Sequence, residues 1–170
     1  MGLLLAMGAA AAQPAAAPCT LIYGHGRNHD PERPQQDRLW DRLNAEFHAA
    51  VLQQWREAGR AAAPLLLPVA ATDLALNLQR LLQESAAQGC TRVLETALFA
   101  DYDGGALVLR LRLYPLQGSL GPRAAGALPA VGQPLLTVQR ELDLANPRSL
   151  ERLDPRVLGR ALASEALAAP

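Results

Sequence analysis

Two short apolar runs, each followed by a longer stretch with helical periodicity, constrain this chain more than any other feature. Residues 19–24, CTLIYG, and residues 63–69, APLLLPV, have the length of a strand and carry no charge. The stretches after them repeat apolar residues every third or fourth position, which is the spacing of one helix face. Strands that alternate with helices in this way are typical of a parallel sheet with helices on its faces. The sequence therefore predicts an α/β fold.

Both helices are predicted from their apolar positions and their end signals. Pro34 can open the first helix and Gly59 can end it. Its inward face is predicted to hold Leu39, Leu43, Phe47, Val51 and Trp55, widened by Trp40 and Leu52. His48 is predicted to lie at the boundary of that face. The second helix begins after a cap at Thr72 or Asp73 and ends at Gly89. Its inward face is predicted to hold Leu74, Leu78, Leu81 and Leu82.

The second half of the chain is predicted to be mainly strands. Residues 90–100, CTRVLETALFA, and 106–116, ALVLRLRLYPL, flank the turn DYDGG and should form an antiparallel hairpin. The second strand alternates, with Val108, Arg110, Arg112 and Tyr114 on a side predicted to face water. Residues 117–133 are rich in Gly and Pro and are predicted to be a mobile surface loop. A fifth strand is predicted over 134–142, and a last helix after Asp154 and Pro155.

Placing these elements together predicts a three-layer, mixed five-stranded sheet in the order 2-1-3-4-5, with strand four antiparallel. Residues 19–168 are predicted to form one domain. The element order β-α-β-α-β-β-β-α over these residues resembles the anticodon-binding-domain-like fold. Among exported proteins, this element order is similar to that of the N-terminal domain of TolB and of lipoprotein activators of penicillin-binding proteins. The resemblance implies a role in protein–protein contact in the cell envelope. Because it rests on element order alone, it assigns no functional residue.

The first residues, MGLLLAMGAAAAQPAAAP, are predicted to be a signal peptide and a linker of small residues, covering 1–18. A short apolar segment leads into small residues, and AAA at 10–12 is an acceptable cleavage site. That segment is too short to span a bilayer, and we expect no transmembrane helix elsewhere. Pro18 stands where a lipid-attachment box needs Gly or Ala, so lipidation of Cys19 is not expected. The predicted destination is a bacterial periplasm.

The two cysteines offer an independent check on the predicted sheet. Cys19 and Cys90 each stand directly before a predicted strand, and a threonine follows each of them. In the predicted order these strands are parallel neighbours, so the cysteines lie side by side within disulfide reach. An oxidising compartment permits the bond. We predict a Cys19–Cys90 disulfide; the alternative is a pair of free thiols that pack as small apolar side chains.

Charge argues against a nucleic-acid partner. The formal net charge is zero, and the 16 basic residues, all of them Arg, are scattered along the chain. No row of cations is present that would neutralise successive phosphates. Arg110 and Arg112 on the water-facing side of their strand could bind an acidic partner.

The loop GHGRNHD, residues 24–30, follows the first predicted strand and is the best candidate for a site. In a 2-1-3 order the gap between strands one and three is the topological switch point, where ligands of open α/β sheets bind. Residues 101–103 leave the carboxyl end of strand three at the same edge. The candidate ligand-binding residues are His25, Arg27, His29, Asp30, Asp101 and Asp103.

The loop could form one of four kinds of functional site, or it could be an ordinary polar turn. A serine hydrolase needs Gly-x-Ser-x-Gly, and QGSLG at 117–121 lacks the first Gly. Dinucleotide binding needs a Gly where His29 stands. Two histidines four residues apart, such as His25 and His29, bind zinc together mainly when they lie on a helix. Pro31 and Pro34 argue against a helix in this segment. Acid–base catalysis would need a histidine beside one of the aspartates. None of these sets is complete, and we expect neither a metal nor a cofactor.

The sequence therefore predicts an exported, non-enzymatic domain that works by protein–protein contact in the cell envelope. The alternative is a small enzyme, or a ligand- or metal-binding protein, that uses the Gly-His-Gly loop. A binding module should expose an apolar or arginine patch on a sheet edge or helix face. A site protein should gather polar groups around a pocket at residues 24–30 and 101–103.

Overall fold

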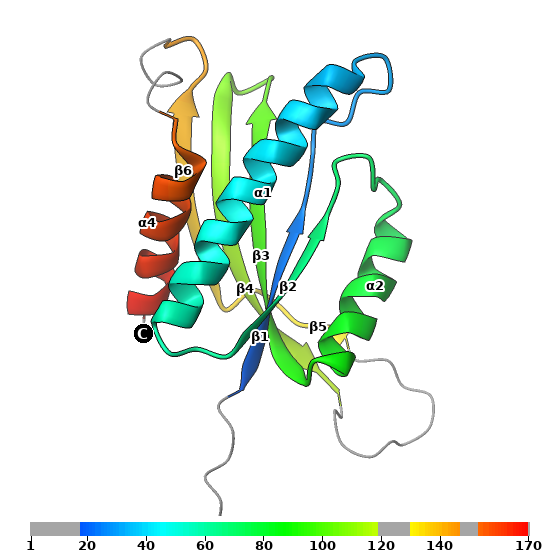
Figure 1. Ribbon diagram of the computed structural model, residues 1–170, viewed down its shortest axis with the longest axis vertical. Coiled ribbons are helices and arrows are strands. Elements are labelled where there is room, and N and C mark those ends of the chain that lie inside the picture. The colour runs from blue at the N-terminus through cyan, green and yellow to red at the C-terminus, as the bar shows by residue number, and fades with distance from the viewer. Residues whose placement is uncertain (1–17, 119–129, 147–152, 170) are drawn as a thin grey trace, which may run out of the picture.

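The computed structural model describes residues 18–118, 130–146 and 153–169. The predicted signal peptide, except for Pro18, lies outside the described residues. In chain order the elements are β1 (Cys19–His25), α1 (Pro34–Glu57), β2 (Ala62–Leu67), α2 (Leu74–Ala87), β3 (Cys90–Asp101), β4 (Ala106–Gln117), β5 (Ala130–Val131), β6 (Leu136–Asp143) and α4 (Pro155–Ala168) (Figure 1). None of the described helices is long and apolar enough to cross a membrane.

The strand order confirms the predicted α/β sheet. β1 lies between β2 and β3 and is parallel to both, while β4 runs antiparallel to β3. The predicted fifth strand is β6, which pairs antiparallel with residues 106–113 of β4. The two-residue strand β5 was not predicted. It pairs with the far end of β4 and lies in the segment expected to be a mobile loop, of which 119–129 are outside the described residues.

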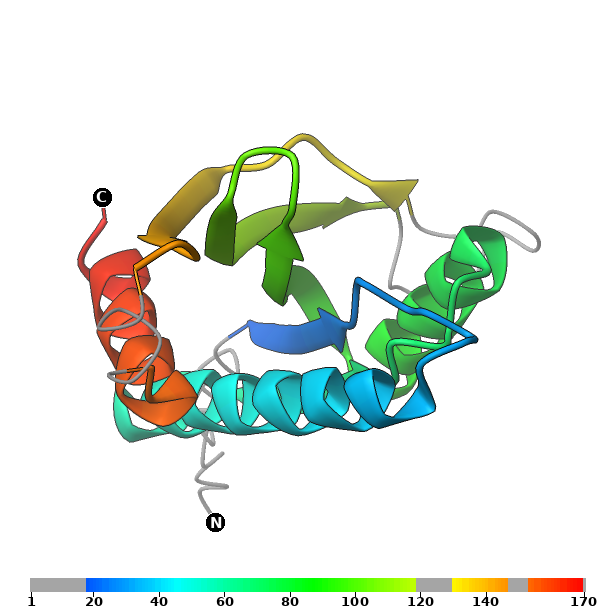
Figure 2. The same cartoon turned by 90° about the horizontal axis from the view of Figure 1, so that it is seen from above.

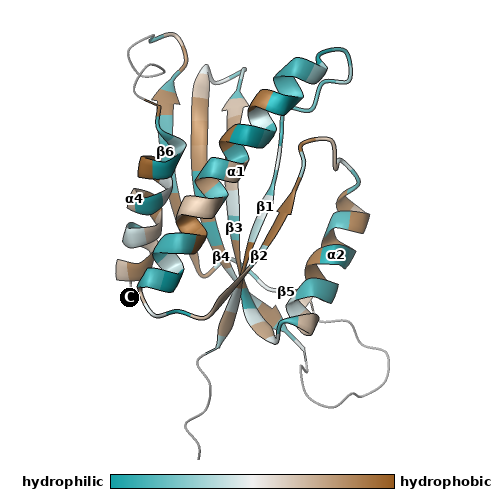
Figure 3. Cartoon of the chain, in the orientation of Figure 1, coloured by the Kyte–Doolittle hydropathy of each residue, from teal (hydrophilic) through white to brown (hydrophobic). Residues whose placement is uncertain are grey.

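Helices cover both faces of the sheet, as the predicted three layers require. Residues of α1 and α4 share one core and residues of α2 belong to the other. Seen from above, α4 lies at the left and α2 at the right, and α1 runs along the bottom of the view (Figure 2). The larger core lies under α1 and α4 and includes Phe47, Val51, Leu94, Leu98, Leu109, Leu111 and Leu162. The smaller core lies under α2 and consists of Leu21, Tyr23, Ala63, Leu67, Leu81, Leu82, Cys90 and Val93. In Figure 3, hydrophobic residues lie along most of the strands, whereas α1 carries mostly hydrophilic ones.

Two asparagine side chains extend the backbone ladder of β3 beyond the point where β1 ends. The amide of Asn44, on α1, donates to the Leu98 carbonyl at 3.1 Å and accepts from the Leu98 N–H at 3.2 Å. The amide of Asn28, in the loop after β1, does the same with Ala100 at 2.8 and 2.9 Å. Buried backbone groups need such partners. Each amide therefore fastens its own segment to β3.

Part of the predicted inward face of α1 is wrong. Leu39 is 42% exposed, whereas Trp40, which was predicted to widen the same face, is buried. An α-helix turns about 100° per residue, so a strict four-residue spacing drifts by about 40° at each step. Over the 16 positions from Leu39 to Trp55 the drift carries Leu39 out of the core.

His48 is buried rather than placed at a boundary. Its side chain lies under β1 and β3, with Nδ1 3.2 Å from the Thr96 hydroxyl oxygen. Its Nε2 is closed off from solvent and has no hydrogen-bond partner among the described residues. Burial lowers the pKa of His48 from 6.5 to about 4, because the charged imidazolium would lose its hydration.

The buried imidazole should make the domain sensitive to acid. Between the unfolded pKa of 6.5 and the folded pKa of about 4, the unfolded chain binds more protons than the folded chain. The free energy of unfolding should therefore fall as the pH decreases through this window, by about 3 kcal/mol in all. Urea unfolding at several pH values measures this slope. The slope should flatten in His48→Gln and persist in His29→Gln, and an unchanged slope in His48→Gln would contradict the account.

Candidate functional site

The two glycines of the Gly-His-Gly sequence are required by close packing. A Cβ atom on Gly24 would lie 2.9 Å from the Thr96 hydroxyl oxygen and 3.0 Å from Nδ1 of His48. A Cβ atom on Gly26 would lie 2.6 Å from the backbone Cα of Val69. These distances are shorter than van der Waals contact, so larger residues would push neighbouring segments apart. The glycines let the end of β1 pass between α1, β3 and the segment after β2.

The predicted loop residues separate into two groups. The first group lies on the face of the sheet that α2 covers in part. His25 Nε2 lies 3.3 Å from a carboxylate oxygen of Glu95, on β3. The guanidinium of Arg27 lies over the ring of Phe99, also on β3, with its carbon 4.6 Å from the ring centroid.

The second group makes local hydrogen bonds within the β1–α1 loop and the β3–β4 turn. His29 Nδ1 is 2.7 Å from Asp37, and Asp30 accepts a hydrogen bond of 2.6 Å from Arg33, so both bind the start of α1. Asp101 accepts from the Gly104 N–H at 3.1 Å and shapes the β3–β4 turn, where Asp103 is exposed. The six candidates therefore do not converge on one point.

Glu95 is the centre of the polar cluster that His25 joins. The hydroxyl of Tyr114 donates to one carboxylate oxygen at 3.2 Å, and His25 contacts the other. Arg110 and Arg112 form longer ion pairs with the same carboxylate, at 3.9 and 4.0 Å. Cross-strand pairing explains the cluster, because Glu95 lies opposite Arg112 and Ala97 opposite Arg110, and cross-strand partners project from the same face.

This environment shifts three pKa values. Burial alone would raise the pKa of Glu95, but the His25 hydrogen bond and the charges of Arg110 and Arg112 outweigh it and lower that pKa. Burial, reinforced by the Glu95 charge, raises the pKa of Tyr23 to about 12. Burial also lowers the pKa of Arg110, and repulsion from Arg112 and Arg27 adds to the effect while Glu95 opposes it. Glu95 is thus ionised and Tyr23 neutral near pH 7.

The expectation that Arg110 faces water is wrong. The residue is 8% exposed, and its guanidinium lies over the ring of Phe99 on the next strand, which Arg27 of the β1–α1 loop also contacts. Sequence reasoning also missed Glu95. The available signal was the single carboxylate in a mainly apolar predicted strand, since such a residue is rarely buried without partners.

A groove runs beside this cluster, between the first turns of α2 and the sheet. It encloses about 260 Å³ and is lined by Tyr23, Leu74, Asn77, Leu78, Leu81, Val93, Glu95, Tyr114 and Val131. Leu81 is buried, whereas Leu74 is 73% and Leu78 46% exposed. The predicted burial of Leu74 and Leu78 is therefore wrong. The start of α2 stands away from the sheet, and these two leucines face the groove without filling it.

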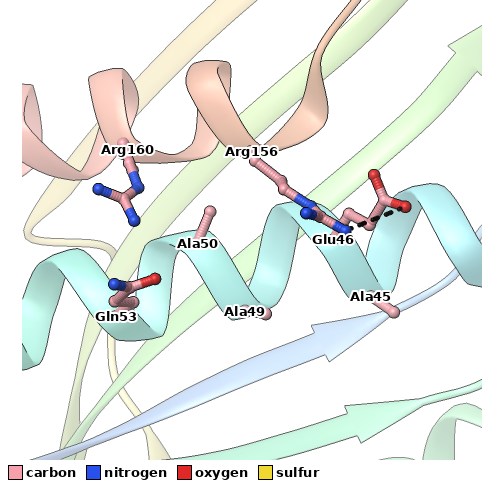
Figure 4. A pocket seen from close by; sticks show the side chains of 7 residues that line it. All are labelled: Ala45, Glu46, Ala49, Ala50, Gln53, Arg156 and Arg160. Atoms are coloured by element: carbon pink, nitrogen blue, oxygen red, sulfur yellow. Dashed lines mark ion pairs between the residues drawn. The ribbon is translucent and has the colours of Figure 1, made fainter.

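A second groove separates α1 from α4 (Figure 4). It encloses about 370 Å³, and small side chains of α1 form its floor. At its rim Arg156 pairs with Glu46 at 3.7 Å, and Arg160 projects from α4 across from Gln53. Across the described part of the chain, no three His, Cys, Asp or Glu side chains gather in a way that could hold a metal.

The disulfide between Cys19 and Cys90 is confirmed. The two residues are register partners at the start of β1 and β3, where a bulge follows in the pairing. The bond occupies the sulfur of Cys19, the atom to which a lipid would be attached.

Comparison with known proteins gives little more. No family model matches the chain, and no curated protein does. Among solved structures the chain is similar to a dodecamer of a PelC variant from Paraburkholderia phytofirmans, at 14% identity. The match covers 93% of this chain and 92% of that one, with a TM-score of 0.40. The likeness is too distant to carry an argument about function.

Proposed function

We propose that this protein is an exported, non-enzymatic domain that binds a protein partner of the cell envelope through its α2 side. The proposal rests on one observation: exposed leucines and a cluster of arginines lie next to each other on this side. We call this surface the recognition face. It consists of the groove at Leu74 and Leu78 and the adjoining arginines Arg27, Arg110 and Arg112.

The recognition face favours a partner segment that is both apolar and acidic. When a partner covers the exposed leucines around the groove, the complex is stabilised by about 25 cal/mol per Å² of apolar surface buried. Arg110, Arg112 and His25 share the single carboxylate of Glu95, and Arg27 has no ion pair among the described residues, so an acidic partner is complementary in charge. Apolar contact would supply affinity, and the charges would supply orientation.

Export is supported by the disulfide, because such bonds persist in oxidising compartments. The predicted signal peptide points in the same direction, and the periplasm is the destination we propose. Recovery of the mature chain in the periplasmic fraction, with both cysteines resistant to alkylation until reduced, would support it. A reduced chain in the cytoplasm would contradict it.

The alternative of a small enzyme is less well supported. His25 and Glu95 form a histidine–carboxylate pair of the kind that can move a proton. Tyr114 and two arginines hold this carboxylate in its ionised form, which can orient a catalytic histidine. However, among the described residues no nucleophilic side chain is hydrogen-bonded to His25, so the catalytic set is incomplete.

Photo-crosslinking in living cells tests the proposed function. A photoreactive amino acid at position 78, in the groove, should crosslink to an envelope protein. The matched control is position 157 on α4, where Val157 is 61% exposed and remote from the recognition face. The adduct at 78 should weaken in Arg112→Glu. Equal adducts at both positions, or none at 78, would contradict the proposal.

A further inference from the structure

The strongest unexplained feature of the molecule is the side chain of Arg110. It is 8% exposed, and its Nε and Nη2 atoms are closed off from solvent without a hydrogen-bond partner among the described residues. The nearest carboxylate oxygen, on Glu95, is 3.9 Å from Nη2, beyond hydrogen-bond distance. A buried cation is costly unless its donors are satisfied. A guanidinium carries five N–H donors, so this one lacks acceptors.

A second guanidinium stands at the same place. Arg27 and Arg110 both contact the Phe99 ring, with their central carbons 4.6 and 5.5 Å from its centroid. Arg27 comes from the β1–α1 loop and Arg110 from β4, so the ring of a third element gathers two cations. No hydrogen bond or ion pair within the described ranges engages Arg27. The charge of Arg27 is also among the causes that lower the pKa of Arg110, so the two cations repel each other and a bound anion would relieve the repulsion.

Glu95 does not supply that anion. Its carboxylate already accepts from Tyr114 and contacts His25, and it shares its longer ion pairs between Arg110 and Arg112. The cluster therefore holds three arginines against one carboxylate. The excess of positive charge lies at the Phe99 ring, which Arg27 and Arg110 both contact.

The loop that carries Arg27 is held in place. Asn28 adopts a left-handed backbone with φ 63°, a conformation that asparagine tolerates better than most residues. Its side chain makes both hydrogen bonds to Ala100, the residue after Phe99. Arg27 is therefore positioned over the ring by its neighbour, as a binding residue should be.

We propose that Arg27 and Arg110 form a binding site for a carboxylate group beside the ring of Phe99, which both side chains contact. Resting on the proposed function, the inference assigns this carboxylate to an aspartate, a glutamate or the C-terminus of the partner segment in the groove. Guanidinium groups bind carboxylates through paired, charge-assisted hydrogen bonds. The site is assigned to a carboxylate because the proposed partner is a polypeptide, whose anionic groups are carboxylates.

Calorimetric titration of the oxidised domain tests the site. The probe is the acetylated peptide Leu-Glu-Leu-Glu-Leu amide, and the matched neutral probe carries Gln in place of Glu. We expect the neutral peptide to bind at least about tenfold more weakly, the loss that one charge-assisted hydrogen bond implies. Arg27→Gln and Arg110→Gln should each cause a similar loss. Arg156→Gln, at the α1–α4 groove, should cause none.

The unfolding midpoint of each variant is the control that shows whether the variant is folded. Arg27 lies in a loop, so Arg27→Gln still tests the site if Arg110→Gln does not fold. Equal binding of both peptides, or full affinity in the folded variants, would overturn the site. Displacement of the peptide by inorganic phosphate at lower concentration than by succinate would overturn its assignment to a carboxylate. A crosslink at position 78 that survives both Gln variants would leave the proposed function standing without this site. Arginine-dependent peptide binding without any crosslink would leave the site standing without the proposed partner.

Discussion

Replacing both cysteines with alanine is expected to lower the free energy of unfolding by roughly 4 kcal/mol. The Cys19–Cys90 bond closes a loop with a sequence separation of 71 residues. In the chain-entropy description, a crosslink of this length removes conformational freedom from the unfolded chain and so stabilises the folded one. Alanine is the better replacement because Cys90 is fully buried, and serine would leave a buried hydroxyl there. Urea unfolding of the two proteins measures the difference.

Reduction of the wild type provides the control for this substitution. A phosphine reductant should lower the unfolding midpoint by nearly the same amount, and it should have no effect on the alanine variant. An alanine variant as stable as the oxidised wild type would show that the bond does not stabilise the fold. The result also bears on export, because a domain that loses this much stability on reduction depends on an oxidising compartment.

Replacing Glu95 with leucine is expected to have a comparable effect, about 4 kcal/mol. Removal of one partner of a buried ion pair costs about 3–5 kcal/mol, because the remaining charge stays buried without compensation. Here the remaining charge is the guanidinium of Arg110, which has no hydrogen-bond partner on Nε or Nη2 among the described residues. His25 and the hydroxyl of Tyr114 would lose their acceptor as well. Chemical denaturation of the variant measures the loss.

The double variant Glu95→Leu/Arg110→Leu separates charge from packing. Because it removes both buried charges, it should be more stable than Glu95→Leu alone, and the difference gives the coupling free energy. Glu95→Gln should fall between wild type and Glu95→Leu, since the amide can still accept from Tyr114. A double variant no more stable than Glu95→Leu would mean that Arg110 does not depend on this carboxylate.

The sequence was sufficient for the sheet because strand order follows from local patterns and handedness. Apolar runs with Gly and Pro at their ends located the strands, and right-handed crossovers left few possible arrangements. The disulfide followed from that order, since Cys19 and Cys90 open neighbouring strands. These inferences need only the position of each residue along its own element.

The recognition face could not be predicted because it depends on contacts between distant segments. Leu74 and Leu78 have the spacing of a buried helix face, and only the distance between α2 and the sheet leaves them exposed. Arg110 alternates like a water-facing strand residue, yet it is buried and contacts Phe99, a ring that Arg27 from a distant loop also contacts. His25 was identified as a candidate, but its partner Glu95 lies 70 positions away.

Nuclear magnetic resonance of the isotopically labelled, oxidised domain would test the recognition face most directly. The arginine Nε–H and leucine methyl signals would be followed while the acidic, leucine-containing peptide is added. The account predicts that the signals of Arg27, Arg110 and Leu78 move together along one binding curve, while those of Arg156 and Arg160 stay in place. Shifts confined to the α1–α4 groove, or signals that do not move at all, would contradict it.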